Sequence, residues 1–193
     1  MSAVKEFEVH AFASAKAWQQ WLAKHHKTSD GIWLRLFKKT SDTPSVTYAE
    51  ALDAALCHGW IDGQLKSHDA QSWLRKFTPR RARSIWSKKN LAHVARLTKA
   101  GKMKAAGLKA LESAKADGRA KVAYDAPGKS EVPKDFLSVL SKNAKAKAFF
   151  ATLNRANVYA ITFRLQTAKK PETREKRMKA ILEMLGKGEK FHG

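Results

Sequence analysis

Apolar residues recur at helical spacing in two segments near the start of the chain. Trp18, Trp21 and Leu22 share one face of a helix, and Ser14 has the side chain and the position to cap its first turn. The four residues TYAE at 47–50 have the spacing of a capping box, and small or apolar residues then recur with helical period as far as Gly59. The pattern therefore predicts two helices, one after Ser14 and one ending near Gly59.

Three other segments have the short apolar runs or the alternation of β-strands. Residues 32–38 are apolar on both faces in the middle, which is typical of an interior strand. Residues 61–67 and 72–78 follow closely on one another, and the turn around His68, Asp69 and Ala70 favours antiparallel pairing of the two.

Beyond Pro79 the pattern is helical almost throughout. Ser84 is a candidate cap for a helix that ends at Gly101, and a further helix runs to about residue 117. The segment YDAPGKSEVP at 124–133 contains two prolines and a glycine, which is typical of a linker. Four more helices are predicted at residues 134–140, 144–153, 158–168 and 172–185.

These elements predict an α+β fold, with a small, mainly antiparallel sheet and helices in the first part and an all-helical second part. All six tryptophans lie between Trp18 and Trp86, so the first part is also the aromatic part. We predict an aromatic-rich α+β domain at residues 1–125 and a basic helical region at 126–193. The helical region either packs on the first domain as one unit or stands apart from it.

Positive charge is concentrated in the later half of the chain. The 38 Lys and Arg against 17 Asp and Glu give a formal net charge of +21. Up to residue 87 there are 13 basic and 8 acidic residues, whereas residues 88–193 have 25 and 9. Such a half could bind nucleic acid or an anionic membrane surface non-specifically. The alternative is that lysines only keep alanine-rich helices soluble.

The sequence lacks the signals of export, membrane insertion and metal binding. No apolar run is long enough to cross a bilayer and the first residues do not resemble a signal peptide, so we expect a cytoplasmic protein. Cys57 is the one cysteine, and there is no CxxC or HxxxH spacing, so we expect no metal site and no cofactor. Cys57 and His58 point about 100° apart on a helix and cannot pair as thiol and base, which favours a buried structural cysteine.

Asp62 follows the turn at Gly59 and could act as a general base in a cleft. Alternatively, its carboxylate pairs with Arg80, Arg81 or Arg83 or caps backbone N–H groups. The residue type and position leave both interpretations open.

The segment PRRARSIWS is the strongest candidate binding site. Its three arginines precede a predicted helix start, where unpaired N–H groups and the helix dipole favour an anion. The alternative is a solvated basic loop whose arginines satisfy carboxylates. The predicted anion-accepting cleft combines these arginines and hydroxyls with two tryptophan walls and one carboxylate: Trp60, Asp62, Arg80, Arg81, Arg83, Ser84, Trp86 and Ser87.

Four blocks of sequence resemble the YdeI/OmpD-associated family, often described as bacteriocin-protection proteins. The blocks are ALCHGWIDGQ at 55–64, FTPRRARSIWSKKN at 77–90, AGKM at 100–103 and FRLQTAKKPETREKRM at 163–178. The resemblance implies a bacterial protein connected with tolerance of bacteriocins or cationic peptides. It implies no catalytic residues.

Three hypotheses for the function follow. A binding module for a small anion accounts for the aromatic part, the arginines and the family resemblance together, and is the leading one. A nucleic-acid-associated protein accounts better for the net charge, although no zinc finger or other sequence-reading motif is present. An enzyme that uses Asp62 or a histidine is the third, and no catalytic residues are assigned. The sequence leaves the oligomeric state open.

Overall fold

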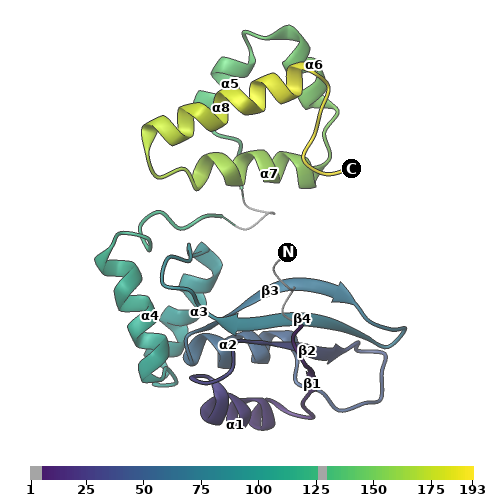
Figure 1. Cartoon of the computed structure of the whole chain (residues 1–193), viewed down its shortest axis with the longest axis vertical. Helices are drawn as coiled ribbons and strands as arrows, with labels where there is room; N and C mark the ends of the chain where they lie inside the picture. Colours follow the sequence, from purple (N-terminus) through teal and green to yellow (C-terminus); the bar gives the residue numbers. More distant parts are fainter. Residues whose placement is uncertain (1–5, 126–129) are drawn as a thin grey trace. The chain divides into compact units, whose positions relative to one another are not determined.

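The computed structural model describes residues 6–125 and 130–193 (Figure 1). The chain divides into two compact units, one of Met1–Ser84 with Asn90–Asp117 and one of Ile85–Lys89 with Gly118–Gly193. The predicted linker at 124–133 and the predicted domain boundary after residue 125 fall on residues 126–129, which lie outside the described residues. The division into domains at that point therefore stays a prediction.

The first unit is built on a four-stranded sheet in the order β1-β2-β4-β3. The three predicted strands are present as β2 (Ile32–Phe37), β3 (Trp60–Ser67) and β4 (Ser72–Pro79), with β4 antiparallel to both neighbours. β1 (Val9–Ala11) pairs in parallel with β2 and was missing from the predicted sheet. The sheet is therefore mixed. Three residues are too few to show an alternating pattern, so only the pairing with β2 reveals this strand.

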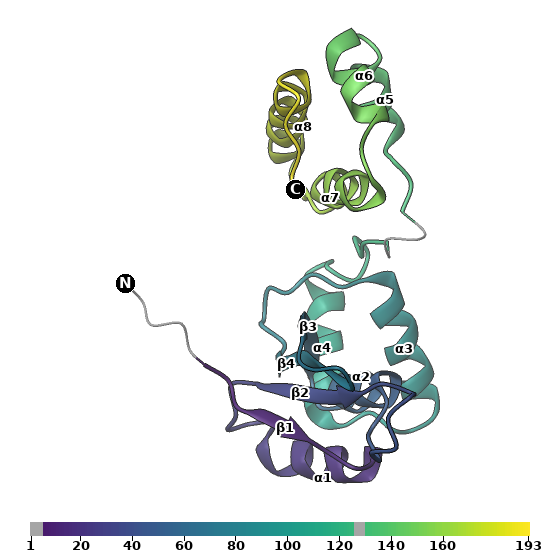
Figure 2. The same ribbon diagram turned by 90° about the vertical axis from the view of Figure 1, so that its right-hand side faces the viewer.

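Helices cover one face of the sheet. α1 (Ala15–His25) and α2 (Tyr48–Cys57) pack on β2, β3 and β4, and α3 (Lys88–Lys99) and α4 (Ala105–Ala116) complete the helices of the first part. Figure 2 shows these helices around the sheet of the first unit. The core between sheet and helices consists of large side chains that are at most 2% exposed, among them Trp18, Leu22, Leu34, Trp60 and Phe77.

The two predicted N-terminal caps are confirmed. The Ser14 hydroxyl accepts a hydrogen bond from the backbone N–H of Ala17, at 3.2 Å. Thr47 and Glu50 form both halves of a capping box at the start of α2. Both caps involve residues three positions apart, so sequence spacing alone was sufficient to find them.

The predicted helix start at Ser84 is wrong, because α3 begins at Lys88. The residues just before it pair with another segment. The carbonyl of Trp86 accepts a hydrogen bond from the N–H of Tyr124 at 3.0 Å, and the N–H of Lys88 donates to the carbonyl of Tyr124 at 2.9 Å. This long-range pairing uses the backbone groups that a first helical turn would need. The arginines at 80, 81 and 83 therefore do not immediately precede the helix N-terminus.

Among its described residues, the second unit contains the four predicted helices: α5 (Lys134–Leu140), α6 (Ala144–Ala151), α7 (Arg155–Gln166) and α8 (Pro171–Gly186). Their shared core is formed by Phe136, Leu140, Ala146, Ile161, Leu165, Ile181 and Leu185. α7 begins three residues before its predicted start because the side chain of Asn154 accepts a hydrogen bond from the N–H of Asn157 and caps the helix there. The predicted α+β class with a helical second part is confirmed.

Two glycines allow the start of α4 to pack directly against the end of α2. A Cβ atom on Gly107 would lie 2.6 Å from the carbonyl oxygen of Leu56 and still closer to that of Cys57. Gly59 has a φ of +74°, and a Cβ there would lie 2.9 Å from the carbonyl oxygen of Ala106. No side chain larger than hydrogen fits between these backbones without displacing them.

We expect Gly107→Ala to lower the free energy of unfolding by about 1–3 kcal/mol, because the new methyl group would force α4 away from α2. This loss would appear even though alanine favours a helix by about 1 kcal/mol over glycine. Gly186→Ala is the matched control in α8, where the nearest atom to an added Cβ is 4.0 Å away. That substitution should be neutral or stabilising. Calorimetric unfolding of the two variants measures both effects, and a stabilised Gly107→Ala protein would contradict the close approach.

Candidate functional site

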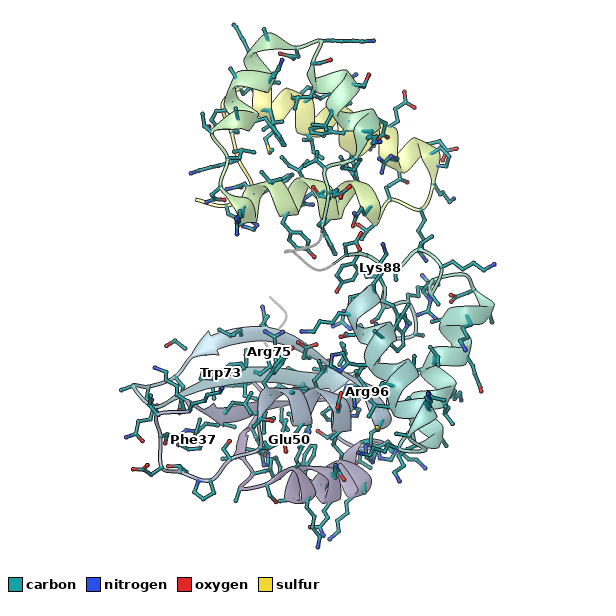
Figure 3. All side chains as sticks on the ribbon, turned by 180° about the vertical axis from the view of Figure 1, so that it is seen from behind. Phe37, Glu50, Trp73, Arg75, Lys88 and Arg96 are labelled. Atoms are coloured by element: carbon teal, nitrogen blue, oxygen red, sulfur yellow. The ribbon has the colours of Figure 1, made fainter. Side chains whose placement is uncertain are left out.

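Asp62 is bound by two side chains on the helix-covered side of the sheet. Its Oδ2 accepts hydrogen bonds from the Tyr48 hydroxyl at 2.8 Å and from Arg75 Nε at 3.0 Å, and the terminal guanidinium nitrogen of Arg75 also bonds to it. The guanidinium lies 5.3 Å from the centre of the Tyr48 ring. Figure 3 shows Arg75 and the neighbouring Trp73 of β4 near the helix that carries Glu50. The partner of Asp62 is therefore Arg75, and the predicted pairing with Arg80, Arg81 or Arg83 is wrong.

Tyr48, Asp62 and Arg75 form a partly buried cluster with a structural role. The Asp62 side chain is only 11% exposed and that of Arg75 22%. Burial, followed by the hydrogen bond and the charge of Asp62, raises the pKa of Tyr48 to about 12. The phenol therefore stays protonated at neutral pH and donates to the carboxylate. The strand register brings Asp62 and Arg75 together. Asp62 of β3 stands opposite Phe77 of β4, and Arg75 lies two residues before Phe77 on the same face of β4.

The other residues of the predicted cleft are distributed over both units. Trp60 is 1% exposed in the core of the first unit, and its Nε1 donates to the carbonyl of His26 at 3.1 Å. In the same unit Arg80 and Ser84 are half-buried and Arg81 and Arg83 are exposed.

The remaining two predicted residues, Trp86 and Ser87, are buried and belong to the second unit. A cleft formed by all eight residues would require a defined placement of the two units, so it stays a prediction.

A cleft of about 510 Å³ lies within the first unit, beside α2. One face of α2 supplies residues at the spacing i, i+3, i+4, i+7 and i+8, and the remaining lining comes from α1, from α3 and from the segment before α4. The lining residues are Ala15, Gln19, Glu50, Asp53, Ala54, Cys57, His58, Leu97, Gly101, Lys102 and Lys104. A polar stripe on an otherwise apolar helix was the sequence signal for this cleft, and it was overlooked.

The two carboxylates of the cleft are already satisfied by neighbours. Asp53 bonds to His93 Nδ1 at 2.8 Å and to Arg96 at 2.5 Å. Burial by itself raises the pKa of Asp53, but the hydrogen bonds and charges of Arg96 and His93 outweigh it and hold the pKa below its usual value. Glu50 accepts from the hydroxyl and N–H of Thr47, and these bonds lower its pKa. Neither carboxylate needs a cation from a ligand.

His58 presents a proton acceptor to the cleft. The residue is 6% exposed, and its Nδ1 lies 3.0 Å from the carbonyl of Ala54, which can only accept, so Nδ1 carries the hydrogen. Burial lowers the pKa of His58, and the neighbouring His26 and Lys104 lower it further against the opposing effect of the Ala54 carbonyl. The ring is therefore neutral near pH 7. Nε2 is left as an acceptor and has no hydrogen-bond partner within the part of the chain that the structure describes.

Cys57 is a thiol rather than a thiolate. Burial raises its pKa first, and the charge of Asp53 raises it further, against smaller opposing effects of nearby lysines and Arg96. The side chain is buried and unpaired in a disulfide. These properties fit a packing role better than a nucleophilic one.

The cleft also has unpaired donors. Among the described residues, the side chains of Gln19, Lys102 and Lys104 have no hydrogen-bond or ion-pair partner. Two ammonium groups and one amide are thus free to bind a ligand, beside the acceptor Nε2 of His58. Such a set matches a small carboxylate or phosphate that also carries a hydroxyl or N–H group.

Among residues 6–125 and 130–193, no three His, Cys, Asp or Glu side chains are grouped so that they could hold a metal ion. None of the described helices is both long and apolar enough to cross a membrane.

Comparison with known protein families divides the chain in two. Residues 10–110 match the model described as Domain of unknown function (DUF8412). Residues 129–188 match the model described as Bacteriocin-protection, YdeI or OmpD-Associated, which confirms the resemblance over the C-terminal part. The blocks at 55–64, 77–90 and 100–103 instead lie within the first match. Searches of curated proteins and of solved structures found no match.

We expect the contribution of Tyr48 to stability to disappear in alkaline solution. Its folded pKa is raised from 10.0 to about 12, so the fold favours the protonated phenol. The resulting stabilisation is fully present below pH 10 and is lost as the pH rises from about 10 to 12. Denaturant unfolding of wild type and Tyr48→Phe across this range isolates the effect from the titrating lysines. The difference between the two proteins should shrink with rising pH, and a constant difference would contradict the prediction.

Proposed function

Because the chain belongs to the family described as Domain of unknown function (DUF8412) and carries a YdeI/OmpD-associated domain in its second part, we propose that it is a cytoplasmic binding module that contributes to tolerance of bacteriocins or cationic peptides. The ligand is a small anion, and the cleft beside α2 binds it. Catalysis is not required for this role.

One observation carries the assignment of the ligand. In the cleft beside α2, Asp53 is paired with Arg96 and Glu50 accepts hydrogen bonds from Thr47, whereas Lys102 and Lys104 lack counter-ions among the described residues. The two unpaired ammonium groups attract an anion to the cleft. Its volume of about 510 Å³ is within the range of small-molecule sites.

The overall charge argues for an indirect route to peptide tolerance. A chain with a net charge of +21 repels cationic peptides rather than capturing them. A small anion, in contrast, is attracted by the whole molecule and by the cleft. We therefore propose that the protein senses or holds an anionic metabolite and does not bind the peptide itself.

A general base role for Asp62 is disfavoured in this proposal. Its Oδ2 accepts from Tyr48 and Arg75, so the carboxylate is already engaged in bonds within the fold. His58 is the better candidate for accepting a proton or hydrogen bond from a ligand, because it lines the cleft and its Nε2 has no hydrogen-bond partner among the described residues.

We expect phosphate to raise the melting temperature of the wild-type protein at constant ionic strength. Binding to the folded state alone contributes about 1.4 kcal/mol when phosphate exceeds its Kd tenfold. Replacing Lys102 and Lys104 together by Gln should abolish the gain, because these are the unpaired cations of the cleft. Thermal unfolding in a phosphate titration measures the effect.

The matched control is the double variant Arg80→Gln/Arg83→Gln, which removes the same charge from the segment that sequence reasoning selected. It should keep the phosphate-induced gain. If this control loses the gain and the lysine variant keeps it, the anion binds at the arginine segment instead. Equal gains in wild type and both double variants would contradict both clefts and leave diffuse electrostatics as the explanation.

A further inference from the structure

The sheet of the first unit has a second face that the core does not use. In β2, Ile32, Leu34 and Leu36 point into the core, so Trp33, Arg35 and Phe37 between them point the other way. The latter three side chains are only half-buried. The helices α1 and α2 contribute their buried side chains to the core face, among them Trp18, Leu22, Ala51 and Ala55.

Cross-strand pairing places lysines beside these aromatic rings. Lys76 stands opposite Trp33 in the β2–β4 register, and Lys66 stands opposite Leu74 in the β3–β4 register. Directly opposite residues of antiparallel strands share a face, so Lys66 and Lys76 belong to the same face as Trp33.

The cations and rings of this face are in contact. The Nζ atoms of Lys66 and Lys76 lie 5.7 Å and 5.9 Å from the centre of the Trp33 ring, and Lys76 Nζ lies 4.0 Å from that of Phe7. The guanidinium of Arg35 lies 4.5 Å from the centre of the Phe37 ring. We call this set of six residues the aromatic–basic face: Phe7, Trp33, Arg35, Phe37, Lys66 and Lys76.

The face has few negative charges. Arg35 is paired with Asp69 at 2.7 Å, at the end of the strands. Lys66 and Lys76 have no carboxylate partner within the described residues. Nearby Glu8 bonds to His10, whose ring contacts Trp21 of α1. Positive charge therefore remains available beside the rings.

We propose that the aromatic–basic face binds single-stranded nucleic acid. Bases stack on the rings of Trp33, Phe37 and Phe7, and the lysine ammonium groups move from the rings to the phosphates. Trp33 and Phe37 are separated by about 13 Å along β2, which leaves room for a few nucleotides.

The aromatic rings of the face select a single strand over a duplex. A duplex hides its base faces, so exposed rings favour an unpaired strand over double-stranded DNA. The proposal is independent of the anion cleft, which is formed by other residues.

The proposal is tested by fluorescence anisotropy with a labelled single-stranded oligonucleotide of about twelve nucleotides and the full chain. Trp33→Val keeps a strand-forming residue but removes the ring, and should weaken binding about tenfold. Trp33→Phe restores a stacking surface and should regain most of the affinity. If Trp33→Val binds as tightly as wild type, or if Trp33→Phe binds no better than Trp33→Val, the proposal is overturned.

The lysines are tested through the salt dependence of binding. Lys66→Gln/Lys76→Gln removes two phosphate contacts and should reduce the slope of log K against log salt by about 1.4. The control Lys16→Gln/Lys24→Gln removes the same charge from exposed positions on α1 and should leave the slope unchanged. Equal losses in the two double variants would overturn the proposal in favour of diffuse attraction. Tighter binding of a duplex of the same sequence would also overturn it.

The thermal stability and the phosphate response of the same variants serve as controls. The face variants should keep the thermal unfolding transition and the phosphate-induced stabilisation of the wild type, which places any loss of oligonucleotide binding on the face itself. Conversely, loss of the phosphate effect in Lys102→Gln/Lys104→Gln with unchanged oligonucleotide binding separates the two sites.

Discussion

The alternation of side chains between the two faces of β2 is the constraint from which the rest of the first unit follows. Because neighbouring side chains of a strand point to opposite faces, Leu34 can be fully buried only if Trp33 and Arg35 face away from it. The core face accepts α1 and α2, and this packing fixes which side of α2 remains for the cleft. The opposite face keeps its aromatic rings and cations, so a single strand determines the location of both candidate surfaces.

The second constraint is the contact of backbone with backbone at the end of α2. Gly107 brings the first turn of α4 against the carbonyl groups of Leu56 and Cys57. This contact holds Lys104 beside His58 and encloses the cleft. The close approach also removes water from that end of α2, which is why Cys57 stays a thiol and His58 stays neutral. The chemistry available in the cleft is thus a consequence of helix packing.

Arginines and lysines contribute differently to the charge of the first unit. In the first unit, Asp53, Asp62 and Asp69 each bind an arginine, so the acidic residues are largely used to fix side chains within the fold. Lysines are the cations left over, both in the cleft and on the aromatic–basic face. This division follows from chemistry, since the planar guanidinium can bind a carboxylate through several N–H groups while the ammonium is a flexible point charge.

The sequence by itself determined the features that depend on neighbours a few residues apart. The caps at Ser14 and Thr47, the strand β2 and the helices of the second unit were all visible as local patterns, as was the α+β class. The family resemblance of the C-terminal part was visible as well. Only the tertiary structure decided the parallel strand β1, the start of α3 at Lys88 and the pairing of Asp62 with Arg75. Each of these rests on contacts between segments distant in sequence, where the backbone or side chain finds a partner that no local spacing encodes.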